Sequence, residues 1–192
     1  MNNIQLIVGS LLLLLFIPKS FSQENDVYYV AEFTDEIRDC DGFENNVFKC
    51  NSLTVSYIKG EEEEEEGKLG LSGKLELLAD ITDEYSIDLK VWKQTDLAKE
   101  FMYAISGSIC ATLHKEDTPW WPLVKSLKSS ECPIKQKEYP IDNMVLSLDF
   151  AKDVLRHEFV GEYEIQLSMI DQLENQLSCH ILFAGISEKT KD

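Results

Sequence analysis

The chain lacks the signatures that hydrolases and nucleotide-binding enzymes leave in a sequence. It has no Gly-x-Ser-x-Gly elbow, no His-Glu-x-x-His and no glycine-rich phosphate loop. Only three histidines are present. His114 and His157 adjoin charged residues, and His180 occupies a polar position of an alternating run, so we expect three surface imidazoles. The sequence therefore favours a protein that is not an enzyme.

Basic residues are few. Eighteen Lys and Arg stand against 35 Asp and Glu, which gives a formal net charge of −17. This balance excludes nucleic acid as a partner, because binding to phosphates requires positive charge. Part of the acidity lies in an unbroken glutamate run at residues 61–66. We expect this run to be a solvated loop between two strands and not a calcium site, because it lacks spaced ligands.

Long apolar runs are missing except at the start of the chain. Residues 4–17 are almost entirely apolar and are followed by Ser20-Phe21-Ser22. The run is too short to span a membrane but has the length of a signal sequence, with small residues where a signal peptidase cleaves. We therefore predict a signal peptide at residues 1–22 and one secreted, extracellular domain at residues 23–192. A retained anchor is the alternative.

The cysteines lack the spacing of a metal site. Five are present, all after the predicted cleavage site, and no two have zinc-finger spacing. We therefore expect no metal and no cofactor. Dispersed cysteines in an oxidising compartment usually pair, and an odd number leaves one that is free or bonded to another chain.

Alternation of apolar and polar residues is the dominant pattern. Such alternation predicts strands with one buried face, and Gly73 marks a bulge in one of them. The predicted strands cover residues 27–33, 53–57, 69–77, 85–91, 144–150, 161–167 and 177–184. We expect the third and fourth of these to pair through a connection at residues 80–84.

One segment has a different period. Leu97, Phe101, Ile105 and Ile109 are spaced by four, with Met102 beside them, and this predicts a helix with one apolar face. Strands before and after it indicate an all-β fold: an immunoglobulin-like antiparallel β-sandwich of about seven to eight strands with one inserted helical segment.

Two adjacent tryptophans stand out in an irregular stretch. Trp120 and Trp121 lie between Pro119 and Pro122. Large apolar side chains in a loop either cap the core or border an apolar cavity, a membrane or a hydrophobic ligand. The sequence leaves both interpretations open.

The C-terminal half resembles a known family. Cys132-Pro133, the strand entry Gly161-Glu162-Tyr163 and Cys179 inside the last strand look like GM2-activator-like proteins, which belong with the MD-2-related lipid-recognition sandwiches. The resemblance implies a cup-shaped sandwich with an open apolar cavity and a partly helical rim, here residues 96–130. The small cysteine set is similar to the insect CheB-type branch, which implies a chemosensory role.

The resemblance also implies a disulfide pairing. Cys40 precedes Ser52-Leu53-Thr54 as the first family cysteine precedes its strand, and that cysteine pairs with the one in the last strand, here Cys179. The Cys-Pro cysteine pairs within the rim, which implies Cys110–Cys132 and leaves Cys50 unpaired. Cys50–Cys179 is a rival pairing.

The leading hypothesis is a secreted carrier that holds a lipid, fatty acid or cuticular hydrocarbon in the sandwich cavity. Contact with a membrane or receptor is a further expectation. The alternative is a secreted protein-binding module that acts as a receptor co-factor, with or without lipid. The candidate cavity and rim residues are Leu97, Phe101, Met102, Ile105, Trp120, Trp121, Leu123, Tyr163, Ile165 and Leu167.

Overall fold

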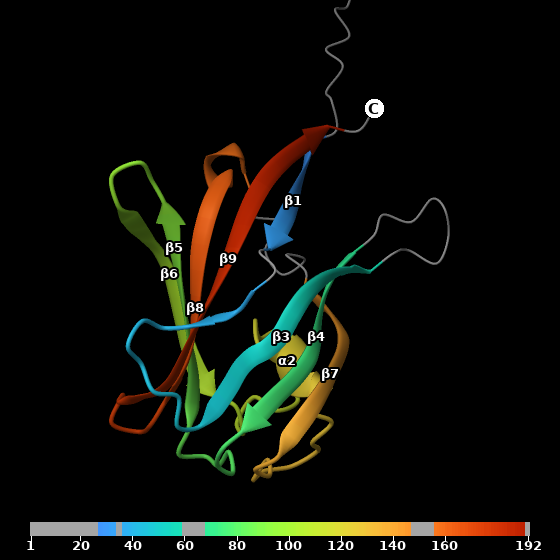
Figure 1. Ribbon diagram of the computed structural model, residues 1–192, viewed down its shortest axis with the longest axis vertical. Coiled ribbons are helices and arrows are strands. Elements are labelled where there is room, and N and C mark those ends of the chain that lie inside the picture. The colour runs from blue at the N-terminus through green and yellow to red at the C-terminus, as the bar shows by residue number, and fades with distance from the viewer. Residues whose placement is uncertain (1–26, 34–35, 59–67, 147–155, 191–192) are drawn as a thin grey trace, which may run out of the picture.

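The computed structural model describes residues 27–33, 36–58, 68–146 and 156–190. The predicted signal peptide, the glutamate run at residues 61–66 and the end of the predicted strand at residues 144–150 lie outside these ranges. The described residues form nine strands in two antiparallel sheets (Figure 1). The predicted all-β sandwich is confirmed.

The larger sheet has six strands, in the order β1-β9-β8-β5-β6, with β2 also paired to β9. Directly opposed residues share a face, so the pairs Ile87–Met169 and Leu89–Leu167 place apolar side chains on one inner face. The strands are β1 (Val27–Phe33), β2 (Arg38–Asp39), β5 (Ser86–Gln94), β6 (Lys99–Ser108), β8 (Gly161–Ile170) and β9 (Gln176–Thr190).

The smaller sheet consists of β3 (Phe48–Ile58), β4 (Lys68–Leu77) and β7 (Glu138–Leu146), with β4 in the middle. The predicted irregularity at Gly73 is present, because the β4–β7 register shifts between Leu71 and Gly73. Gly73 has φ +131°, and an added Cβ would lie 2.1 Å from the Ser52 carbonyl oxygen. Only glycine accommodates this conformation and this close approach.

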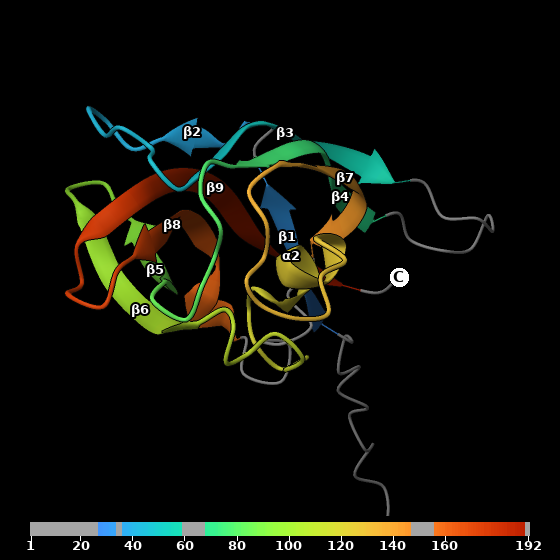
Figure 2. The same ribbon diagram turned by 90° about the horizontal axis from the view of Figure 1, so that it is seen from below.

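The core lies between the two sheets. Leu53 and Leu75 of the smaller sheet and Ile87 and Met169 of the larger sheet belong to one buried apolar cluster. Helical structure is confined to two short pieces of the described chain, α2 (Trp121–Ser126) and a 3₁₀-helix, η2 (His157–Phe159). Helix α2 packs against β7, at one side of the sandwich (Figure 2).

The helix predicted from Leu97, Phe101, Ile105 and Ile109 is wrong. Residues 99–108 form β6, which pairs with β5 along its length. A spacing of four fits a strand as well as a helix, because four is an even number and alternate strand residues share a face. A bulge opposite Val91 and Trp92 then turns Phe101 to the face opposite that of Ile105.

The predicted pairing of residues 69–77 with residues 85–91 is also wrong. These stretches lie in β4 and β5, which belong to different sheets. The connection crosses between the sheets and is anchored where Ile81 and Ile134 exchange two backbone hydrogen bonds of 2.8 and 2.9 Å. Both strands have one buried face, so their alternation is satisfied equally well by partners in either sheet.

Candidate ligand-binding cavity and its rim

The two sheets are connected by a segment that we call the rim, residues 109–133, between β6 and the Ile81–Ile134 bridge. The predicted rim began at residue 96, but residues 99–108 belong to β6. A disulfide between Cys110 and Cys132 ties the two ends of the rim together. A second disulfide joins Cys40 to Cys179, and Cys50 is a buried free thiol. These are the pairs that the resemblance to GM2-activator-like proteins implies.

The two tryptophans of the rim lie in different environments. Trp120 is 4% exposed, belongs to the core cluster and donates a hydrogen bond of 3.1 Å from Nε1 to Thr112 Oγ1. Its ring covers Gly107, where an added Cβ would lie 3.0 Å from Trp120 Cζ2. Trp121, the first residue of α2, is half-buried. Trp120 therefore caps the core, as one of the two sequence interpretations expected.

An apolar cavity lies between the sheets beneath α2. Its volume is about 20 Å³, which is room for roughly one water molecule. All ten lining side chains are apolar and come from both sheets, the rim and the connection between the sheets. They are Phe48, Leu75, Leu77, Ile81, Ile87, Ile109, Leu123, Val124, Leu127 and Met169.

The structure disperses the candidate residues named from the sequence. Leu123 lines the cavity, whereas Tyr163, Ile165 and Leu167 lie on the inner face of β8, and Ile105 on that of β6, outside the lining. Three others are exposed near or at the β5–β6 hairpin, away from α2 in both views (Figures 1 and 2): Leu97 at 98%, Phe101 at 58% and Met102 at 37%.

Most cavity residues were missed by sequence reasoning. Leu75, Leu77 and Ile87 lie in alternating runs that predict strands, so the sequence predicts their burial. Nothing in those runs distinguishes a side chain that borders a cavity from one that packs in the core. Val124 and Leu127 lie in and just after α2, four and seven residues beyond Trp120.

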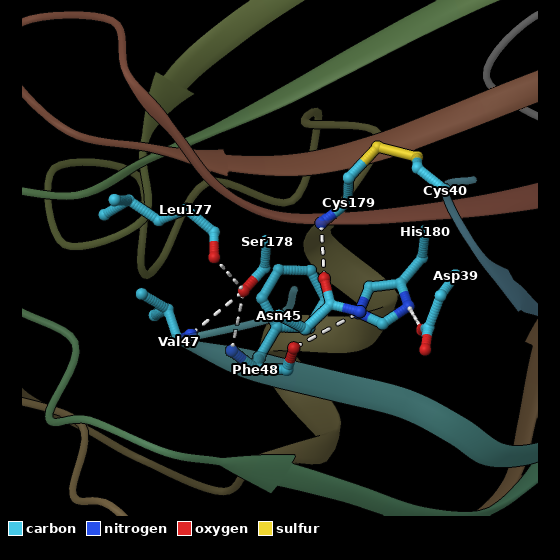
Figure 3. A network of polar contacts seen from close by, with 9 residues as sticks. All are labelled: Asp39, Cys40, Asn45, Val47, Phe48, Leu177, Ser178, Cys179 and His180. Carbon is cyan, nitrogen blue, oxygen red and sulfur yellow. Dashed lines mark hydrogen bonds and ion pairs between the residues drawn. A yellow bond between two sulfur atoms is a disulfide. The ribbon is translucent and has the colours of Figure 1, made fainter. Parts of the chain in front are cut away.

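Polar contacts tie the two sheets together where β3 meets β9 (Figure 3). Ser178 Oγ accepts hydrogen bonds from the backbone amides of Val47 and Phe48, at 3.0 and 3.1 Å. The Cys179 amide donates to Asn45 Oδ1 at 2.7 Å. These three hydrogen bonds fix the approach of the two sheets beside the Cys40–Cys179 disulfide.

His180 belongs to the same network, and the prediction of a surface imidazole is wrong. The residue is 1% exposed, and its ring centroid lies 4.8 Å from that of Phe48. Nε2 donates to the Phe48 carbonyl oxygen at 3.2 Å. Nδ1 lies 3.0 Å from Asp39 Oδ1, without the geometry of a hydrogen bond. Sequence parity failed because residues 178–180 are buried on both faces of β9.

Burial lowers the pKa of His180, although the Phe48 carbonyl and Asp39 oppose that shift. A folded-state pKa below the unfolded value of about 6.5 means that folding favours the neutral ring. Its contribution to stability is present above pH 6.5 and is lost as the pH falls below that value. We therefore expect the free energy of unfolding to fall between pH 7 and pH 5, and to fall less in a His180→Gln variant.

Urea unfolding at a series of pH values measures this effect. His114 is exposed, so a His114→Gln variant is the matched control and should follow the parent protein. Equal pH dependence in the parent protein and the His180→Gln variant would contradict the assignment.

Among the described residues, no group of three or more His, Cys, Asp or Glu side chains is arranged to hold a metal ion. Within the same residues, no helix is long and apolar enough to cross a membrane.

The fold and the cavity define a class of protein: a two-sheet antiparallel sandwich with an apolar interior space closed by a disulfide-tied rim. No family model matches the sequence, and no curated protein matches it. One similar solved structure is a Niemann-Pick type C2 protein from the Japanese carpenter ant, with 15% sequence identity and a TM-score of 0.39. The match covers 77% of this chain and 96% of that one. A likeness of this size carries no argument about function.

Proposed function

We propose that the protein is a secreted carrier that binds an apolar ligand between its two sheets, beneath α2. The observation that carries this proposal is the cavity, which is lined by apolar side chains alone. Small apolar cavities stay dry and accept apolar molecules, and transfer of apolar surface from water contributes about 25 cal/mol per Å². Such binding needs no catalytic residue.

The cavity must enlarge to hold a lipid. Its volume is about 20 Å³, whereas pockets for small ligands usually measure roughly 300–1,000 Å³. Leu123, Val124 and Leu127 reach the cavity from the rim, and the rim is joined to the strands at the Cys110–Cys132 disulfide. We propose that the ligand displaces these three side chains while the disulfide keeps the ends of the rim in place.

Secretion and family membership are part of the same proposal. Two disulfides in the described chain support an oxidising compartment, and the apolar start of the sequence supports export. The disulfide pairing supports membership of the GM2-activator-like proteins. The chemosensory role and the cuticular-hydrocarbon ligand rest on the resemblance to the CheB-type branch alone.

A protein-binding module remains the second candidate, and one observation favours it. β6 is the end strand of its sheet in the described chain, and Phe101, Met102 and Tyr103 are exposed along it. An end strand with exposed apolar side chains is a surface on which another chain can add a strand. Co-purification of a protein partner that is lost on Phe101→Ser substitution would support this candidate.

Titration with a neutral apolar fluorophore, N-phenyl-1-naphthylamine, tests the carrier function. We expect saturable binding at one site. A Leu123→Phe variant fills the cavity and should weaken binding at least about tenfold, which corresponds to roughly 1.4 kcal/mol. The matched control is Leu97→Phe, because Leu97 is 98% exposed and distant from the cavity lining.

Circular dichroism confirms that both variants are folded before they are compared. Absence of saturable binding to the parent protein would refute the carrier function. If the Leu97→Phe and Leu123→Phe variants weaken fluorophore binding equally, the binding site does not lie in the cavity.

A further inference from the structure

A second hollow lies beside the apolar cavity. It is a groove of about 310 Å³, and most of its lining surface is polar. Part of the lining comes from the rim after α2 and part from the residues that lead into β7. The lining residues are Leu127, Lys128, Ser129, Ser130, Glu131, Cys132, Pro133, Lys135, Lys137 and Tyr139.

The groove concentrates positive charge in a strongly acidic protein. Three lysines line it against one acidic residue, Glu131, whereas the chain as a whole has 18 basic and 35 acidic residues. Lys135 is held by Asp80, with 2.8 Å between Nζ and Oδ2. Lys128 and Lys137 make no ion pair with any described residue. Among the described residues, these two lysines of the groove therefore have no carboxylate within ion-pair distance.

Two of the three lysines, Lys135 and Lys137, contact one buried tyrosine. Tyr139 is 5% exposed, and its hydroxyl donates a hydrogen bond of 2.7 Å to the Lys135 carbonyl oxygen. The ring of the same tyrosine lies below Lys137, whose Nζ is 4.6 Å from the ring centroid. One buried side chain thus fixes the backbone of Lys135 and the ammonium group of Lys137, so the charge of Lys137 is positioned before any ligand arrives.

The groove and the apolar cavity share one lining side chain. Leu127, which is 6% exposed, lines both of them. Leu127 is also one of the three rim side chains that the proposed ligand displaces. Its movement would join an apolar space to a groove that carries two unpaired ammonium groups.

We propose that the ligand is an anionic amphiphile, whose chain occupies the cavity and whose carboxylate or phosphate head binds Lys128 and Lys137 in the groove. This inference rests on the proposed carrier function and adds the chemical class of the ligand. The head group is held by charge, and Ser130 supplies a hydroxyl donor in the same lining, whereas the Ser129 hydroxyl donates to the Glu131 carbonyl oxygen at 2.9 Å. A neutral hydrocarbon would leave the lysine groove unused.

Paired ligands of equal chain length test the proposal. Binding of hexadecanoate and of hexadecanol to the purified protein is compared by native mass spectrometry and calorimetry. An exposed ammonium–carboxylate contact changes affinity by a factor of about 1.4 to 5. Two such contacts predict that the acid binds about tenfold more tightly than the alcohol, and that raising the salt concentration reduces the difference. Inorganic phosphate and acetate, which have no chain, should bind far more weakly.

Two double variants locate the effect. Lys128→Gln with Lys137→Gln should weaken hexadecanoate binding about tenfold and leave hexadecanol binding unchanged. The control, Arg38→Gln with Lys189→Gln, removes the same charge from exposed positions of the six-stranded sheet and should change neither.

The outcomes separate this inference from the carrier function. If hexadecanol binds as tightly as hexadecanoate, the carrier function stands and the lysine groove has no role. If the control variant weakens the acid as much as the lysine variant, the effect is one of net charge and the groove is again refuted. If neither long-chain ligand binds, the carrier function itself fails. Tight binding of phosphate without a chain would identify a site for free anions and overturn the amphiphile.

Discussion

The Trp120→Ala substitution should lower the free energy of unfolding by about 3–5 kcal/mol. Trp120 is 4% exposed, packs in the core cluster and donates a hydrogen bond to Thr112. Truncation leaves a cavity beneath the rim and removes the hydrogen bond that Thr112 Oγ1 accepts from Trp120, although that hydroxyl still donates to the Ser108 carbonyl oxygen. Urea unfolding followed by circular dichroism measures the change, because this signal does not depend on tryptophan fluorescence.

The neighbouring tryptophan supplies the control. Trp121 is half-buried, so the Trp121→Ala variant should lose clearly less stability than the Trp120→Ala variant. The two interpretations that the sequence left open make opposite predictions here. A Trp120→Ala variant of nearly unchanged stability that no longer binds an apolar probe would restore Trp120 to the border of the ligand site.

Removal of the Cys40–Cys179 disulfide should cost about 5 kcal/mol in the chain-entropy model, because the bond closes a loop with a sequence separation of 139 residues. The Cys110–Cys132 bond has a separation of 22 residues, and its removal should cost about 3.4 kcal/mol in the same model. Double Cys→Ala variants of each pair, unfolded in guanidinium chloride, give the two values.

Peptide mapping without reduction must accompany these measurements. It should recover Cys40 with Cys179 and Cys110 with Cys132. A Cys50→Ala variant is the control, because Cys50 is unpaired and its replacement leaves both loops closed. Recovery of a Cys50–Cys179 peptide would contradict the pairing and would remove the basis for the larger effect.

Strands were predictable wherever one face is buried and the other faces water. Residues 27–33 correspond to β1 in full, and residues 161–167 and 177–184 lie within β8 and β9. Local alternation is sufficient in these stretches, because the two-residue period of a strand is visible in the strand itself. The sandwich follows from the number of such strands.

Properties that depend on partners were not predictable in the same way. The helix expected from Leu97, Phe101 and Ile105 failed because an even spacing satisfies both periods. His180 failed because its burial comes from residues 38–48, more than 130 positions earlier in the chain. The predicted pairing of β4 with β5 is wrong because the alternation within a strand does not determine which other strand it pairs with.

The candidate site contains one residue that the sequence predicted and others whose position depends on tertiary packing. Leu123 was predicted to line the cavity because it follows Trp120 and Trp121 closely in the segment predicted to form the rim. The other cavity residues come from β3, β4, β5, β8, the inter-sheet connection and the rim, and only tertiary packing brings them together. The groove was missed because the lysines that line it are ordinary exposed residues, and their significance depends on Tyr139 and on the space between them.

The buried thiol of Cys50 has a consequence for the durability of the protein. Burial raises the pKa of this thiol, and the charge of Asp39 raises it further, so the folded protein holds almost no Cys50 thiolate. Thiol–disulfide exchange requires attack by a thiolate. The native fold therefore shields both cross-links from the one internal nucleophile that would reshuffle them. Once the chain unfolds, the Cys50 thiol regains its ordinary reactivity. Unless the solution is acidified, its thiolate then exchanges with the two disulfides, and the mispaired disulfides prevent refolding. In this protein, the disulfides are therefore protected from exchange with Cys50 only while the chain remains folded.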